Sequence, residues 1–236
     1  MPYTYKYPRP AVTVDAVLFG LASSHQLKVL LIQRKKAPFI NDWALPGGFV
    51  DLAEDLTTAA LRELEEETGV KNIFLEQLFT FGAPNRDPRG RTISVAYYGL
   101  VNLSEHPVKA ASDAKNVAWF DLDNLPKLAF DHANIIKAAI QRLRGKIRYQ
   151  PIGFELLPPK FTLKELQQLY EKILGTKFND RNFRTRIVKM GILKKMGKQQ
   201  NVAHRPAILY AFDKENYDHF VKEKEDWINR RVYFEI

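Results

Sequence analysis

The sequence has no cysteine among its 236 residues and no uninterrupted apolar run long enough to cross a membrane. The missing cysteine excludes disulfides, thiolate zinc sites and cysteine nucleophiles. The missing apolar run, which would need about 20 residues, excludes a membrane-spanning helix. The first ten residues mix prolines and tyrosines with Lys6 and Arg9, and they lack the apolar centre of a signal peptide. We therefore expect a cytoplasmic protein with no membrane partner.

Acidic side chains are in the minority, and the excess of positive charge is uneven along the chain. The formal net charge is +9. Residues 1–150 carry 19 basic and 16 acidic side chains, whereas residues 151–236 carry 17 and 11. Near the junction, Pro151, Gly153 and Pro158-Pro159 argue against a continuous helix and indicate a domain boundary. We predict a first domain over 1–150 and a smaller, more basic domain over 151–236.

The first domain has the pattern of a mixed α/β sandwich. A helix over 56–68 is rich in Ala, Leu and Glu and is ended by Gly69, and a second helix is predicted from an Asp131 N-cap to about residue 144. A polar turn at 23–25 joins the first two strands into a hairpin. The apolar segments that predict strands cover 11–19, 28–33, 74–81, 94–101 and 116–121.

The helix over 56–68 carries three carboxylates on one face. Glu63, Glu66 and Glu67 lie at positions i, i+3 and i+4, which are neighbours on an α-helix. A hard divalent cation would relieve their mutual repulsion, and magnesium prefers carboxylate oxygens, water and phosphate as ligands. An acidic, solvated helix face is the alternative interpretation of the triplet alone. Gly48 and Glu54, at fixed offsets before the triplet, favour the metal site.

Over residues 48–70 the chain resembles the Nudix hydrolases. Gly48, Glu54 and the run from Arg62 to Val70 match the signature of that superfamily at every specified position. The resemblance covers about residues 10–145 and implies the Nudix α/β/α sandwich. Within the signature, Glu54 and Arg62 would brace the loop and the helix.

The same resemblance implies the roles of the acidic residues. Gly48, Glu63 and Glu67 would hold magnesium, or manganese in its place. Glu63, Glu66 and Glu67 would carry catalysis, in which water attacks a phosphorus atom of a diphosphate. The residue that activates the water, Glu66 or Glu63, is left open.

The segment after the Nudix signature points to the substrate. Pro84 stands at about the distance at which Nudix ADP-ribose hydrolases carry a marker proline, so the resemblance implies ADP-ribose or a related nucleoside diphosphate derivative. Arg86, Arg89 and Arg91 follow on a predicted tight turn, and guanidinium groups match phosphate oxygens. A polar hairpin tip is the alternative. Candidate stacking partners for adenine, with a place in the core as the alternative, are Phe39, Trp43 and Tyr98.

The second domain has the element order of a winged helix-turn-helix. Thr162-Leu163-Lys164-Glu165 has capping-box spacing and begins an amphipathic helix that ends before Gly175. A second helix is predicted over 179–190, ended by Gly191. Strands over 192–198 and 206–212 follow, with a basic loop between them. In this fold the second helix enters the DNA major groove.

From Arg181 to Arg205 the chain has eight basic residues and no acidic one. Phosphates dominate the affinity of a duplex for a protein, so double-stranded DNA is the partner that this segment indicates. A dimerisation or protein-contact module is the alternative. One winged helix reads a half-site, which favours a homodimer. The candidate DNA contacts are Arg181, Arg184, Thr185, Lys189, Lys198 and Arg205.

Across nearly its whole length the chain resembles the Nudix-related transcriptional regulators of NAD or pentose metabolism. The resemblance implies a DNA-binding regulator that responds to ADP-ribose. Many such regulators are expected to have eroded signatures, whereas this one is intact, so magnesium-dependent ADP-ribose diphosphatase activity is expected as well. Two alternatives stay open: an ADP-ribose pyrophosphatase whose second domain serves association, and a decapping-type hydrolase that holds RNA.

Overall fold

A computed structural model describes residues 6–22, 26–103, 105–106, 108, 114–200 and 205–220. The chain divides into two compact units, one made of residues 1–22 and 27–141 and the other of residues 23–26 and 142–236. The division falls within a long helix, α2 (His132–Tyr149). Each unit is described below by itself.

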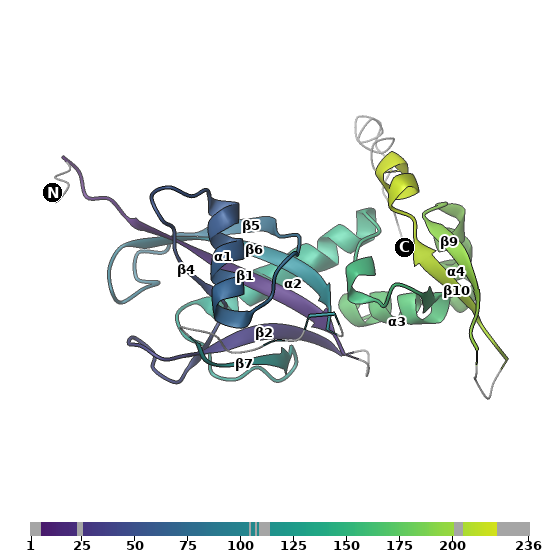
Figure 1. The fold of residues 1–236 in the computed structure, drawn as a ribbon, viewed down its shortest axis with the longest axis horizontal. Coiled ribbons are helices and arrows are strands. Elements are labelled where there is room, and N and C mark those ends of the chain that lie inside the picture. The colour runs from purple at the N-terminus through teal and green to yellow at the C-terminus, as the bar shows by residue number, and fades with distance from the viewer. Residues whose placement is uncertain are drawn as a thin grey trace. The chain divides into compact units, whose positions relative to one another are not determined.

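The first unit is built on a seven-stranded mixed sheet (Figure 1). Its central pair, β1 and β6, is parallel, and eleven residues of each strand are in register. The strand order is β3-β2-β1-β6-β5, while β4 pairs with β1 and β7 pairs with β2. The strands are β1 (Ala11–Leu21), β2 (Leu27–Arg34), β3 (Trp43–Ala44), β4 (Gly47–Phe49), β5 (Glu76–Phe81), β6 (Thr92–Asn102) and β7 (Ala114–Asp121).

Helix α1 (Leu56–Thr68) covers one face of this sheet, and α2 lies on the other face (Figure 1). Ala60 and Leu64 of α1 share a core with Val14 and Leu18 of β1. Because both faces are covered, every residue of β1 from 13 to 21 is buried, and the strand is apolar almost throughout rather than alternating. The helix predicted over 56–68 and the α/β/α sandwich are confirmed.

Local signals fix both ends of α1. The Asp55 carboxylate accepts the N–H groups of Thr57 and Thr58, which have no partner within the helix. At the other end Gly69 adopts φ 74°, a left-handed conformation that glycine allows at little cost. These ends set where the helix begins and stops, while the packing of Ala60 and Leu64 on the sheet sets the face on which its glutamates stand.

The second unit has the winged-helix order (Figure 1). Thr162 and Glu165 form the predicted capping box, and Gly175 ends the helix that follows it. Leu166, Leu169 and Tyr170 form the buried face of this helix. The elements are a short 3-10 helix (Phe154–Leu156), β8 (Phe161–Thr162), α3 (Leu163–Leu174), α4 (Asp180–Lys189), β9 (Leu193–Lys198) and β10 (Ile208–Phe212), and the sheet order is β8-β10-β9.

The structure departs from the sequence expectations in a few places. Helix α2 runs to Tyr149 rather than to about residue 144. The short strands β3, β4 and β8 were not predicted, since two or three residues carry no periodic signal. The expected turn at 23–25 lies outside the described residues, as does the tip of the basic loop at 201–204. Of the described helices, none has the length and apolar character needed to span a membrane.

Candidate functional site

The loop before α1 is held in place by one arginine. The guanidinium of Arg62 donates to both carboxylate oxygens of Glu54, at 2.6 and 2.9 Å, and to the carbonyl of Phe49 at 3.2 Å. Glu54 also accepts the N–H of Asp51 at 2.8 Å. The hydrogen bond from Arg62 lowers the pKa of the Glu54 carboxyl, so Glu54 stays ionised and the loop stays closed onto the helix.

Two of the three helix carboxylates face this loop from partly buried positions. Glu67 is only 7% exposed, and its Oε2 accepts the N–H of Gly47 at 2.9 Å. Burial raises the pKa of Glu67 to about 8. Burial likewise raises the pKa of Glu63, whose carboxylate lies so close to Gly48 that a side chain at position 48 would overlap it. Burial therefore disfavours the charged form of both carboxylates, while Arg62, which donates to Glu63 at 2.8 Å, opposes this effect at Glu63.

A divalent cation fits this arrangement. Hard oxygen donors from Glu63 and Glu67 converge beside glycine backbone, which leaves room for a backbone carbonyl ligand. Glu66 is more exposed and accepts from Arg62 at 3.2 Å. Within the described part of the chain, no three His, Asp or Glu side chains form a ready-made metal site. An ion here would need water or ligand oxygens to complete its shell, as magnesium does on a phosphate.

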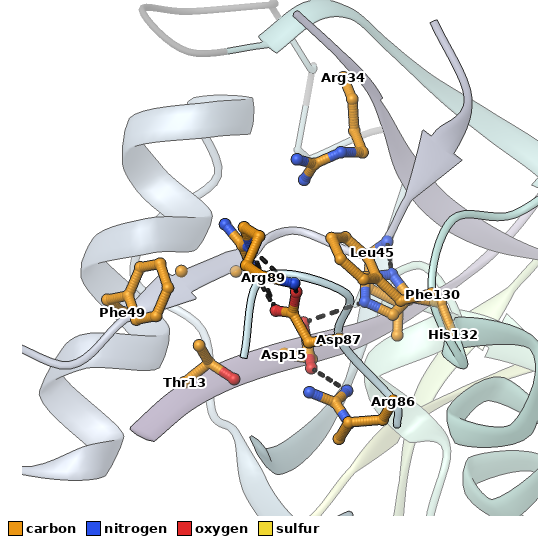
Figure 2. A pocket seen from close by; sticks show the side chains of 12 residues that line it. Thr13, Asp15, Arg34, Leu45, Phe49, Arg86, Asp87, Arg89, Phe130 and His132 are labelled. Carbon is orange, nitrogen blue, oxygen red and sulfur yellow. Dashed lines mark hydrogen bonds and ion pairs between the residues drawn. The ribbon is translucent and has the colours of Figure 1, made fainter. Parts of the chain in front are cut away.

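Gly47 and Gly48, which contact Glu67 and Glu63, also line a pocket. Figure 2 shows the other side chains that line it. Its walls come from β1, β2, β4, the 82–91 loop and the residues around the start of α2, so segments far apart in sequence meet here. The lining residues are Thr13, Asp15, Arg34, Leu45, Gly47, Gly48, Phe49, Arg86, Asp87, Arg89, Phe130 and His132.

One wall of the pocket is a buried ion-pair network centred on Arg86. The Arg86 side chain is only 4% exposed and donates to both oxygens of Asp131, at 2.7 and 3.0 Å. It also approaches Asp15 at 3.4 Å, and Ser94 donates its hydroxyl to that same Asp15 oxygen. The guanidinium of Arg86, a predicted phosphate ligand, thus binds the carboxylates of Asp131 and Asp15. Asp131, the predicted helix cap, uses both carboxylate oxygens to bind it.

His132 completes this wall as a neutral imidazole. Its Nδ1 accepts the N–H of Leu45 at 2.8 Å, so the ring proton is assigned to Nε2, which lies 3.4 Å from Asp15. Burial lowers the pKa of His132 below its usual value. Protonation would abolish the bond from Leu45, so both burial and geometry favour the neutral ring.

Besides Arg86, the guanidinium groups of Arg34 and Arg89 and the rings of Phe49 and Phe130 line the pocket (Figure 2). Arg89 is paired with Asp87 at 2.7 Å and lies over the rings of Phe49 and Phe130, 5.0 and 5.4 Å from their centroids. Arg34 lies 4.8 Å from the Phe130 centroid. Burial, and then repulsion from Arg89, lowers the pKa of Arg34. An anionic ligand with an aromatic ring would relieve that repulsion and could stack here.

The ring of Phe130 is held in an uncommon backbone conformation. Its φ of 51° is left-handed, which is costly for a bulky residue and is often found where a side chain must be aimed at a ligand. Phe39, a predicted stacking partner, packs edge to face against this ring at 4.9 Å. Trp43 instead packs on Phe120, and Tyr98 is buried.

The other predicted substrate residues lie on the surface of the 82–91 loop. Arg91 is exposed and donates to the carbonyl of Gly82 at 2.7 Å, and Pro84 is exposed. Neither residue lines the pocket. Conversely, sequence reasoning missed Asp15, Arg34 and His132. The available signal was Asp15 itself, a charge within an otherwise apolar strand.

The predicted DNA contacts are exposed residues of the second unit. Phe183 and Ile187 anchor α4 to the core, and the predicted contacts on this helix stand away from these anchors. All six side chains are exposed: Arg181, Arg184, Thr185 and Lys189 on α4, Lys198 at the end of β9, and Arg205 before β10.

Fold and site together define a Nudix-domain protein with an appended winged helix, and comparison with known families agrees. The NUDIX domain family matches residues 9–139, and the NrtR DNA-binding winged helix domain matches residues 153–212. The chain belongs to the NrtR family of Nudix-domain proteins.

Two curated relatives span different parts of the chain. The ADPR responsive transcriptional repressor NtrR of Acinetobacter baylyi is 40% identical over 216 residues, which cover 90% of this chain and 86% of that protein. The ADP-ribose pyrophosphatase of Methanocaldococcus jannaschii is 44% identical over 131 residues, which cover 56% and 73%.

Two solved structures of Shewanella oneidensis NrtR are also similar. NrtR complexed with a 27mer DNA superposes with a TM-score of 0.77 at 37% identity, covering 88% of this chain and 95% of that one. The NUDIX domain of NrtR complexed with ADP ribose superposes with a TM-score of 0.55 at 39% identity, covering 60% and 94%.

Proposed function

We propose that the chain is a cytoplasmic, ADP-ribose-responsive transcriptional regulator. The observation that carries this proposal is the joining, on one chain, of a pocket suited to a nucleoside diphosphate and a basic winged helix. The winged helix binds duplex DNA, and a homodimer places two such helices on two half-sites. The ADPR responsive repressor of Acinetobacter and the Shewanella complexes with DNA and with ADP ribose support DNA and ADP-ribose as the two ligands.

The pocket carries charged and aromatic groups that match the diphosphate and the base of ADP-ribose. Arg34 and Arg89 supply positive charge for the diphosphate, and Phe49 and Phe130 supply faces on which an aromatic base can lie. Arg86 acts through its carboxylate partners by holding the pocket wall. Arg91 and Pro84 contribute only if the ligand reaches beyond the pocket along the 82–91 loop.

We further propose that the Nudix domain retains hydrolysis of ADP-ribose to AMP and ribose 5-phosphate. The intact carboxylate set favours this second activity, and the Methanocaldococcus relative supports it. Gly48, Glu63 and Glu67 would hold magnesium, which would supply positive charge beside the diphosphate. Glu63 or Glu66 orients water for attack on phosphorus. Arg62 keeps both residues in place through its contacts at 2.8 and 3.2 Å.

Regulation requires that ADP-ribose change the affinity of the chain for DNA. By linkage, a nucleotide that weakens DNA binding must itself bind less tightly to the DNA complex, and such couplings are typically about 1–3 kcal/mol. The division between the units falls within α2, which begins at the pocket residue His132. We therefore place the coupling in this helix.

The test is selection of bound duplexes from random DNA by the full chain, with and without ADP-ribose. We expect one palindromic site to be enriched and its affinity to change with ADP-ribose. Arg184→Ala should weaken binding and reduce its salt dependence if the side chain meets a phosphate. Lys71→Ala is the matched control, because it removes an exposed charge from the first unit outside α2. Failure to enrich any site at physiological salt would overturn the proposal that the chain is a transcriptional regulator.

Hydrolysis is tested separately with magnesium and ADP-ribose. We expect AMP and ribose 5-phosphate from the wild type and greatly reduced turnover in Glu67→Gln, because an amide is a poorer ligand for a hard cation. If ADP-ribose and related dinucleotides stay intact after incubation with the wild type, the hydrolysis proposal is wrong, and the Nudix domain then only binds the nucleotide.

A further inference from the structure

The outer face of α4 carries two β-branched side chains among its basic residues. Phe183 and Ile187 point into the core, so at 100° per residue Thr185 stands near the centre of the opposite face. Val188, three residues later, lies beside it and is 45% exposed. Arg181 and Lys189 flank the pair.

Thr185 presents its methyl group rather than a free donor. Its hydroxyl donates to the carbonyl of Arg181, one turn earlier, at 2.9 Å. The hydroxyl proton is therefore used in a hydrogen bond within the helix, and only the methyl group and the lone pairs of the hydroxyl oxygen are available to a partner. Val188 has no polar group at all. Together they form a small apolar patch, the Thr185–Val188 patch, on an otherwise cationic surface.

Neither residue is explained by the stability of the helix. Thr and Val are weaker helix formers than Ala, Lys or Arg, and an exposed position lets a helix use any of these. Apolar exposure on the one face that is also basic therefore favours a contact with a partner. The surrounding charge fixes the sign of that partner, since Arg181, Arg184 and Lys189 attract a polyanion.

In the major groove of duplex DNA, the apolar feature of a base pair is the C5-methyl group of thymine. We infer that the Thr185–Val188 patch reads thymine methyl groups, while the flanking arginines and lysine contact phosphates or guanine. The inference rests on the proposed DNA binding and deepens it, because it names the residues that select sequence and the bases that they select.

The experiment replaces thymine with uracil, which lacks only the methyl group, at each thymine of the selected duplex in turn. With the full wild-type chain, we expect one or two positions in each half-site to lose about three- to five-fold in affinity, the effect of one buried methyl group. Thr185→Ser and Val188→Ala remove methyl groups from the protein side. In each variant the uracil penalty should vanish at one position and persist at the other.

The controls separate this inference from DNA binding itself. Val12→Ala removes methyl groups from a 38% exposed valine of the first unit and should leave every uracil penalty unchanged. Full affinity for duplexes with uracil at every position would overturn the inference while leaving DNA binding intact. Penalties that persist in both variants would also overturn it. Absence of any selected duplex would instead overturn the proposed function, and the inference with it.

Discussion

Glu67→Gln is predicted to stabilise the metal-free protein at alkaline pH. The Glu67 carboxyl is buried and accepts the N–H of Gly47, a bond that the amide oxygen of glutamine can also accept. Burial raises the pKa of Glu67 to about 8 in the folded state, against 4.5 for an unperturbed carboxyl. Ionisation of Glu67 therefore opposes folding, and glutamine removes that ionisation with little change in shape.

The sign follows from proton linkage. Between pH 4.5 and about 8 the folded state holds a proton on Glu67 that the unfolded state has lost, so the stability of the wild type falls as pH rises through this window. At about 1.4 kcal/mol for each pKa unit, the difference between about 8 and 4.5 gives an upper bound of about 5 kcal/mol. We expect on the order of 2–5 kcal/mol in favour of the variant at pH 8 and little difference at pH 5.

The assay is denaturant unfolding with a chelator present, at intervals from pH 5 to pH 9. Glu65→Gln is the matched control, because it removes the same charge from the exposed side of the same helix. We expect the control to follow the wild type. Parallel stability curves for wild type and Glu67→Gln across the whole range would refute the reasoning.

Magnesium should stabilise the wild type more than the variant. Binding to the folded state alone stabilises a protein by mass action, and the wild type retains the carboxylate that the variant lacks. We expect saturating magnesium to raise the unfolding free energy of the wild type at pH 8 and to change that of Glu67→Gln far less. An equal gain in both proteins would remove Glu67 from the metal site.

Three further predictions follow from single contacts. Arg62→Lys should lower magnesium affinity and turnover about ten-fold or more with little loss of fold, because one ammonium group cannot replace the contacts that the guanidinium makes with Glu54, Glu63 and Glu66 together; titration calorimetry with magnesium checks this, and unchanged affinity contradicts it. Arg86→Met should destabilise the first unit by about 3–5 kcal/mol, because it leaves the carboxylates of Asp131 and Asp15 without their positive partner. Chemical denaturation measures this change, and a loss under about 1 kcal/mol would show that the network contributes little to stability. Tyr170→Phe should be neutral or stabilising by up to about 1 kcal/mol, since among the described residues the buried Tyr170 hydroxyl has no hydrogen-bond partner; marked destabilisation in thermal unfolding would mean that the hydroxyl is bonded in solution.

The sequence by itself determined those features whose signals are local. The carboxylate face of α1 follows from the spacing of Glu63 and Glu67 and from the stop at Gly69, because the helical repeat places such residues together whatever surrounds them. The capping box of α3 and the exposed basic face of α4 follow in the same way from residues within one or two turns. These features include the metal ligands that we propose and the surface that we propose for DNA.

Only the tertiary structure decided how the pocket is built. The pocket residues Asp15, Arg34, Arg86 and His132 are separated by long stretches of chain. They meet because β1, β2, the 82–91 loop and the start of α2 converge beside Gly47 and Gly48. No local rule states that Arg86 will be buried between Asp131 and Asp15 rather than turned to a ligand. Burial and charge pairing depend on which distant segments pack together, and spacing along a single sequence does not record that.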